Sequence, residues 1–238
     1  MRVLYFGFYD PDYARNRVLI KGLKANGVEV LECRDDSPGL KKFFRLYKKH
    51  KAFKNKYDVM VIGFLGHAVV PLAKMISSGP VIFDAFVSLY DSNVFDRKLA
   101  GPKSIKAAYY RFLDWFSMKL ADIVLFDTLE HKNYAIKKFG LKERKVKRIF
   151  VGTDDSIFYR REPPNADVSG SQFVVHFHGS FIPLQGVDVI IDAARILEKD
   201  HPEIHFTLVG TGQTYGAMRA RAEGLKNITF RDRVRYRD

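Results

Sequence analysis

The sequence predicts an α/β protein built on doubly wound parallel sheets that carry helices on both faces. Short apolar runs, typical of buried strands, recur along the 238 residues. Segments whose apolar residues have helical spacing separate these runs, and such alternation is typical of parallel sheets. Glycine or proline marks many junctions, as at Asn26-Gly27 and Ser78-Gly79-Pro80.

The elements of the first part of the chain alternate in order. Strands are expected at residues 3–6, 28–31, 58–62, 81–83, 122–126 and 146–151. Between them we expect a helix ending at Ala25 and further helices at residues 40–53, 69–76, 105–120 and 130–139. Ligands of such sheets bind at the carboxyl ends of the strands, so residues that directly follow strands are the first functional candidates.

A second run of strands and helices follows residues 158–171, which are rich in proline, serine and charge and are typical of a linker. It has expected strands at 173–177, 204–209 and 228–230, with helices after Gly186 and near Tyr215. We therefore predict an N-terminal Rossmann-like domain at 1–157, a linker at 158–171 and a C-terminal Rossmann-like domain at 172–238. Since the last run amounts to half of a doubly wound domain, we expect the second domain to be incomplete.

Composition narrows the partners and the compartment. The net charge of +13 favours anionic partners, which include nucleotide diphosphates, anionic lipid and nucleic acid. The single Cys33 cannot form an internal disulfide, so a reducing cytoplasm is the simplest setting. No apolar segment is long enough to cross a bilayer. Nucleic acid is not expected as a partner, because no recognition motif of that class is present.

The stretch at residues 172–197 organises the chain. Gly179 ends an apolar strand, and Gln185-Gly186 leads into a helix. The N-terminus of a helix presents free N–H groups and a positive dipole end, which together bind phosphate. Two glycines alone do not separate such a site from an ordinary turn of a βαβ protein.

This stretch resembles the first loop and helix of the donor-binding domain in family 4 glycosyltransferases. The similarity continues in IHFTLVGTGQTY, NITF and VKRIFVGTDDSIFYR, and on the N-terminal side in FYDPDYARNRVLIKGL and SLYDSNVFDRKL. The resemblance implies the GT-B architecture, in which two Rossmann-like domains face each other. It also implies retaining transfer of a hexosyl group from a nucleotide-diphosphate sugar to a glycan or lipid-linked acceptor. It implies no metal and no cofactor besides this co-substrate.

Three positions depart from the pattern of that family. Ser180 stands where the family has arginine, and Gln185 where it has lysine. The acidic motif that holds the donor ribose would lie beyond Asp238. We therefore expect a truncated transferase without turnover of its own. The diphosphate charge would be met by backbone N–H groups or by a cation such as Arg15.

The candidate donor-binding residues are Gly179, Ser180, Gln185, Gly186, Gly210 and Gly212. The candidates for acceptor or phosphate contact are Tyr13, Arg15, Asn16 and Ser88. Asp84 and Asp91 are the candidate catalytic carboxylates, which could orient an acceptor hydroxyl or act as a base.

Each candidate has a structural alternative. Asp12 could cap the first helix and leave Arg15 in solvent, and the polar residues after strand four could only form turns. For Asp127 and Thr128, capping of a helix is the favoured interpretation. Asp10-Pro11-Asp12 matches a metal-binding pattern of other transferases, but its proline suits a turn, and we expect no metal site.

Residues 40–58 combine a basic and an aromatic side. Such a helix can lie in an anionic membrane surface, which would make the protein peripheral on the inner face of the membrane. It can equally cover a sheet with its aromatic side and leave its basic side in water.

Two other functions stay open. A sugar-nucleotide epimerase of similar architecture would act on the same donors, and product analysis with and without an acceptor would separate it from a transferase. A nucleic-acid-binding protein, supported only by charge, would show affinity that falls steeply with salt.

Overall fold

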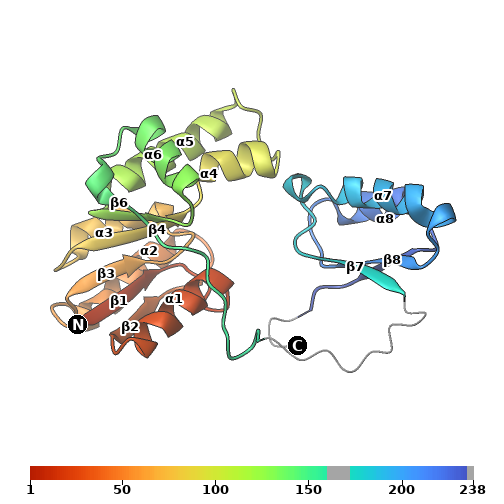
Figure 1. The fold of residues 1–238 in the computed structure, drawn as a ribbon. Coiled ribbons are helices and arrows are strands. Elements are labelled where there is room, and N and C mark those ends of the chain that lie inside the picture. The colour runs from red at the N-terminus through yellow and green to blue at the C-terminus, as the bar shows by residue number, and fades with distance from the viewer. Residues whose placement is uncertain (160–171, 235–238) are drawn as a thin grey trace. The chain divides into compact units, whose positions relative to one another are not determined.

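The computed structural model describes residues 1–159 and 172–234, which form two compact units (Figure 1). Unit 1 comprises Met1–Asn93 and Ala100–Phe158, and unit 2 comprises Val94–Leu99 and the residues from Tyr159 onward. The expected linker at 158–171 lies outside the described residues, apart from Phe158 and Tyr159.

Unit 1 is built on a six-stranded sheet in the order β2-β1-β3-β4-β5-β6, with every pair parallel. The strands are β1 (Arg2–Gly7), β2 (Glu29–Arg34), β3 (Val59–Ile62), β4 (Val81–Phe86), β5 (Ile123–Phe126) and β6 (Val146–Arg148). All six predicted strands are confirmed. The last is shorter than the predicted 146–151, because β5 offers only Val124–Phe126 for pairing and the chain then leaves the sheet.

The helices of unit 1 cover both faces of this sheet, as a doubly wound fold requires. They are α1 (Ala14–Ala25), α2 (Lys41–His50), α3 (Val70–Ile76), α4 (Leu89–Asp91), α5 (Ile105–Leu120) and α6 (Leu129–Phe139). Strands β2 and β3 lie on opposite sides of β1. The helix that connects β2 to β3 therefore packs on the opposite face of the sheet from the helix that connects β1 to β2. The core residues show the result: α1 packs on one face, and α2, α3, α5 and α6 pack on the other.

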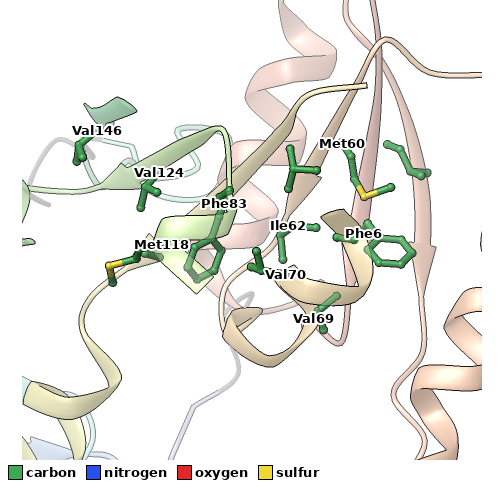
Figure 2. Close-up of a cluster of buried hydrophobic side chains, with 14 of the residues drawn as sticks. Phe6, Met60, Ile62, Val69, Val70, Phe83, Met118, Val124 and Val146 are labelled. Carbon is green, nitrogen blue, oxygen red and sulfur yellow. The ribbon is translucent and has the colours of Figure 1, made fainter. Parts of the chain in front are cut away.

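The larger core lies between the sheet and the second of these faces. Figure 2 shows part of it, where Phe6, Ile62 and Phe83 of neighbouring strands lie with Val70 of α3 and Met118 of α5. Short 3-10 turns at Lys51–Phe53, His67–Val69 and Glu143–Lys145 complete the connections. The sequence predicted a loop after β4, but α4 and a π-helical segment at Ser92–Asp96 form there.

Unit 2 has the three parallel strands and two helices that were predicted. The sheet order is β7 (Phe173–His178), β8 (Ile204–Val209) and β9 (Ile228–Arg231). The helices α7 (Val187–Asp200) and α8 (Tyr215–Arg221) bury a core around Phe181, Ile191 and Leu208. Among all described residues, no helix is both long and apolar enough to cross a membrane.

The segment that follows β6 is tied to α1 by an ion pair. Lys21 donates both to the carboxylate of Asp154 and to the Ser156 hydroxyl, the latter at 2.8 Å. The Ser156 hydroxyl and amide also donate to Asp154. The hydrogen bonds from Lys21 and Ser156 lower the pKa of Asp154 to about 2.

This lowered pKa predicts a loss of stability in acid. An unfolded aspartate titrates near pH ~3.9, so Asp154 stabilises the fold above that pH and loses its contribution as the pH falls toward 2. Urea unfolding at pH 6 and pH 3, followed by the fluorescence of the single tryptophan, Trp115 in α5, should show a smaller pH-dependent loss in Asp154→Asn than in the unaltered chain. Equal losses in the two proteins would contradict the assignment.

Candidate active site

A buried ion pair stands at the carboxyl edge of the unit 1 sheet. Arg15, in the first turn of α1, donates from Nε to Asp84 Oδ2 at 2.9 Å and from Nη2 to Asp84 Oδ1 at 2.8 Å. Its Nη1 donates to the carbonyl of Ile149 at 3.0 Å, and its guanidinium lies 4.9 Å from the centre of the Phe86 ring. One side chain thereby joins α1 to the carboxyl end of β4 and to the segment that follows β6.

The burial of this pair changes the roles predicted for both residues. The side chains of Arg15 and Asp84 are only 3% and 0% exposed. Burial raises the pKa of Asp84, and the hydrogen bonds and charge of Arg15 oppose that shift. The alternative of a solvated Arg15 is therefore wrong. The roles predicted from sequence, phosphate contact for Arg15 and catalysis for Asp84, require exposed surface that neither side chain has here.

Both polar atoms of the Asn16 side chain are used in hydrogen bonds within unit 1. Tyr5 Oη and the amide of Phe64 donate to its Oδ1 at 2.9 and 3.1 Å, and its Nδ2 donates to the carbonyls of Asp10 and Phe64. It is fully buried, which argues against the predicted contact with a ligand. Gly63 allows this close packing: a Cβ there would lie 2.6 Å from the Tyr5 ring and 3.0 Å from Asn16 Oδ1.

The loop between β1 and α1 keeps one exposed candidate. Asp10 accepts a hydrogen bond from the amide of Asp12 at 2.9 Å, which closes a turn. The N-cap position of α1 is Tyr13, so the alternative in which Asp12 caps this helix is wrong. The Tyr13 ring is 43% exposed and lies 5.2 Å from the ring of Phe64. Part of the surface of Tyr13 is therefore exposed at this edge.

Asp114 of α5 holds the loop after β4 through hydrogen bonds. This fully buried carboxylate of α5 accepts from the Ser88 hydroxyl at 2.8 Å and from the amides of Leu89 and Tyr90 at 2.9 Å. His67 Nε2 lies 3.2 Å from it. Ser88 also accepts from the Asp91 amide and caps α4, so the predicted ligand contact of Ser88 is replaced by a structural role. Sequence reasoning missed Asp114, a lone acid within an otherwise apolar and basic helix.

Two further carboxylates are joined to α6. The Tyr134 hydroxyl donates to Asp91 Oδ1 at 3.1 Å, and burial together with the Asp91 charge raises the pKa of Tyr134 to about 12. His131 Nδ1 lies 2.7 Å from Asp127 Oδ1. The cap predicted at this helix is confirmed for Thr128, which accepts from the His131 amide, whereas Asp127 pairs with the imidazole instead.

These contacts leave Tyr13, Asp91 and His131 as the candidates in unit 1 that retain exposed surface. The His131 side chain is 44% exposed, and Asp91 is half-buried. The sequence carried a signal for His131, because Asp127 and His131 have the i,i+4 spacing of helical neighbours. It carried none for Tyr134, whose partner lies 43 residues away in the chain.

The loop of unit 2 between β7 and α7 is a candidate anion site of smaller extent than predicted. The amides of Gly179, Phe181 and Gln185 are used in hydrogen bonds to backbone carbonyls, as are those of Ile182 and Gly186. Gly186 has φ +61° at the N-cap of α7, and in the described part of the chain no side chain caps this helix. The Val189 amide donates to the carbonyl of Gly186, so the available donors are the N–H groups of Val187 and Asp188 at the start of α7 and that of the exposed Ser180.

Gly210 and Gly212 have a structural role in addition to the donor contact predicted for them. A Cβ on Gly210 would lie 1.9 Å from the carbonyl oxygen of Gly179, and one on Gly212 would lie 2.6 Å from that of Phe181. The loops after β7 and β8 therefore pack backbone to backbone. Their glycines allow this contact, which holds the loop before α7 in place.

Comparison with known proteins identifies the fold. HepE from Anabaena, solved with UDP, matches with a TM-score of 0.61 at 16% identity, over 99% of this chain and 70% of HepE. WaaG, a glycosyltransferase of lipopolysaccharide biosynthesis, matches with 0.60 at 14%, over 98% of this chain and 70% of WaaG. The chain has the GT-B fold.

A third GT-B match is the UDP-GlcNAc 2-epimerase from Neisseria meningitidis, solved with UDP-GlcNAc. Its TM-score is 0.56 at 14% identity, over 99% of this chain and 73% of the epimerase. No protein-family model and no curated protein sequence matches the chain. At these identities the structural similarity establishes the fold alone, so function has to be argued from the residues.

The buried pair predicts an asymmetric mutational effect on unit 1 of this GT-B fold. Asp84→Asn leaves the Arg15 charge buried without its partner and should cost about 3–5 kcal/mol in free energy of unfolding. Replacing both partners, with Arg15→Met and Asp84→Leu, should cost less than the single change, because no unpaired charge is left. Urea unfolding followed by Trp115 fluorescence measures both. A double variant that is less stable than Asp84→Asn would contradict the assignment.

Proposed function

We propose that the protein is a nucleotide-sugar glycosyltransferase of the retaining family 4 type, which transfers a hexosyl group to a glycan or lipid-linked acceptor. The observation that carries the proposal is the strand–loop–helix unit β7-α7, whose uncapped helix N-terminus follows a glycine loop at the carboxyl end of a strand. This is the arrangement that binds phosphate in doubly wound sheets. The GT-B fold and the sequence resemblance support the same function.

In sugar transfer from such a donor, the role of this loop is to stabilise the charge of the diphosphate leaving group. When the sugar leaves the donor, negative charge develops on the diphosphate, and fixed N–H dipoles near it lower the barrier. Ser180 and the first turn of α7 supply such dipoles, and the loop from Gly179 to Gly186 contains no cation and no acid. The proposal requires neither a metal nor a cofactor besides the nucleotide sugar.

On the unit 1 side, Asp91 and His131 are the groups that could orient an acceptor hydroxyl. Each is held by a hydrogen bond to a neighbour, Asp91 by Tyr134 and His131 by Asp127. A held carboxylate or imidazole can accept the proton of a hydroxyl group as that group attacks. Arg15 and Asp84 support this edge of the sheet without touching the reacting atoms.

An epimerase is the second candidate, favoured by the match to the UDP-GlcNAc 2-epimerase. The two functions share a donor site and differ in product. Incubation with UDP-GlcNAc alone would release an epimer or free sugar in the case of an epimerase, whereas a transferase forms a new glycoside only when acceptor is added. The basic nucleic-acid-binding alternative has no observation in its favour beyond the charge.

Changes at Ser180 test the donor site. Ser180 is exposed, so substitution leaves the packing intact. We expect Ser180→Asp to abolish binding of UDP and GDP in calorimetry, because a carboxylate would face the diphosphate. Ser180→Arg with Gln185→Lys should tighten binding at least ~10-fold, since charged hydrogen bonds contribute about 1.5–3 kcal/mol.

A matched control for Ser180→Asp is a substitution in α7, the helix that follows the loop. Ile196 in α7 is 73% exposed and lies three turns beyond the loop, so Ile196→Asp introduces the same charge away from the site. It should leave the affinity for UDP and GDP unchanged. The donor-site assignment fails if Ser180→Asp and Ile196→Asp bind these nucleotides equally well.

A second part of the proposal is peripheral attachment to an anionic membrane surface through residues 40–58, from the cytoplasmic side. The core takes only part of the aromatic side of the helix at 40–53: Phe43, Leu46 and Phe53 face the core, whereas Phe44 and Tyr47 are exposed by 59% and 37%. Around the exposed rings lie lysines, with Lys48 4.5 Å from the Phe44 ring centre and Lys51 5.1 Å from that of Tyr47.

Not every cation of this segment is available to lipid. Lys49 lies 3.0 Å from Asp35 and donates to the carbonyl of Arg34, so it serves the fold. Lys51 and Lys54 border a hollow of about 910 Å³ between α2 and α3, together with Phe44, Tyr47 and Met75. An aromatic hollow with a cationic rim suits the headgroup region of an anionic bilayer.

Vesicle co-sedimentation tests this attachment. Binding should require anionic lipid and weaken with salt, and Lys48→Gln with Lys54→Gln should reduce it about 30-fold, because each lysine near such a surface contributes about 1 kcal/mol. The matched control is Lys199→Gln with Lys226→Gln in unit 2. If both double variants sediment alike, or if the unaltered chain stays in the supernatant with every lipid, the attachment is refuted.

A further inference from the structure

Helix α5 leaves four large apolar side chains on its outer surface. Its buried positions are Ala107, Asp114, Ser117 and Met118, and of these only Met118 is a large apolar residue. The outer positions are Ile105, Tyr109, Phe112 and Trp115, which are 91%, 54%, 52% and 44% exposed. A helix on a sheet usually turns its apolar stripe toward the core, so an aromatic stripe on the outer face of α5 needs an explanation.

The exposed residues form a continuous stripe. Ile105, Tyr109 and Phe112 follow one another at the i, i+4, i+7 spacing of a single helix face. The Phe112 ring stacks on Phe116 with centroids 5.4 Å apart and 12° between the planes, and it lies 6.1 Å from Trp115. From Ile105 to Trp115 the stripe runs about 15 Å along the helix.

The charges beside the stripe are all positive. A hollow of about 430 Å³ next to Phe112 and Trp115 is bordered by Lys103, Arg111 and Lys138. The only acidic residue of α5 is Asp114, which is fully buried against the loop after β4. The outer surface of this helix is therefore aromatic and cationic, which selects an anionic partner.

This surface belongs to the same layer of helices as the segment at 40–58. Both α2 and α5 pack on the same face of the unit 1 sheet, and α3 contacts each of them. Between them, Met75 of α3 is 75% exposed. Exposed apolar side chains with cationic neighbours thus extend across the breadth of one layer, and a broad partner surface fits them better than a small ligand does.

We propose that the aromatic stripe of α5 inserts into the interface of an anionic bilayer, so that α2 supplies the charge and α5 the apolar contact. Tryptophan and tyrosine rings favour the headgroup level of membranes, and aliphatic side chains such as Ile105 lie below it. The inference rests on the membrane attachment proposed for residues 40–58 and is independent of sugar transfer.

Trp115 provides the test, because it is the only tryptophan of the chain. On addition of vesicles that contain anionic phosphatidylglycerol, its emission should shift to shorter wavelength and become protected from acrylamide. Brominated acyl chains in the vesicles should quench it. Vesicles of phosphatidylcholine alone should produce none of these changes, because they lack the charge that attracts the basic surface.

Variants separate insertion of α5 from membrane attachment through α2 alone. Phe112→Ser should remove most of the shift in Trp115 emission and lower vesicle affinity at least tenfold, whereas Ile196→Ser, a change at an exposed apolar residue of unit 2, should do neither. Co-sedimentation without any change in Trp115 emission would overturn the insertion of α5 and leave attachment through α2 standing. Absence of co-sedimentation would refute both.

A soluble polyanion tests whether the surface binds an acidic glycan in place of a bilayer. If heparin oligosaccharides shift Trp115 emission and anionic vesicles do not, the surface binds an acidic glycan and the bilayer assignment is wrong. Nucleotide binding in unit 2, measured on the same samples, reports whether the donor site is intact in each variant.

Discussion

The pair formed by Arg15 and Asp84 is the interaction on which the functional edge of unit 1 depends. Burial of an ionised side chain is costly unless it is paired and hydrogen-bonded, so each of these groups requires the other. Because Arg15 also donates to the carbonyl of Ile149, the pair holds α1, β4 and the segment after β6 together. The neighbouring bonds of Asn16 add the loop after β3. The groups that keep exposed surface in this part of unit 1, Tyr13, Asp91 and His131, can therefore be presented on a rigid framework.

Most of the fold could be predicted because apolar periodicity reports directly on burial. The strand at Ile204–Val209 and the helix at Ile105–Leu120 have the predicted limits. The exceptions are set by partners distant in the chain. Pairing with β5 stops at Phe126, which ends β6 early, and the hydrogen bonds from Asp114 hold the loop after β4 where α4 forms. Neither constraint is visible in the residues that it shapes.

The candidate site shows the same limit more sharply. The position of Arg15 and Asp84 after strands indicated the right edge of the sheet, but the sequence could not show that two residues 69 positions apart neutralise each other. A charged residue after a strand can face a ligand or a partner, and local sequence does not distinguish the two. The glycines of unit 2 are a similar case. The close contact between two loops is sufficient to explain glycine at Gly210 and Gly212, so these residues alone are not evidence for a phosphate site.

Helices α2 and α5 show how one periodic pattern can serve two surfaces. In α2, Phe43 and Leu46 face the core while Phe44 and Tyr47 face outward, so counting apolar residues cannot decide between a core and an interface role. In α5 the inner face includes a carboxylate whose burial is offset by hydrogen bonds from Ser88, Leu89 and Tyr90. That arrangement stabilises a loop at the candidate active site and leaves the aromatic residues of α5 outside the core. Aromatic side chains that stay exposed to water contribute little to the stability of the fold. We therefore infer that the stripe is there to contact a partner, which we propose is the bilayer.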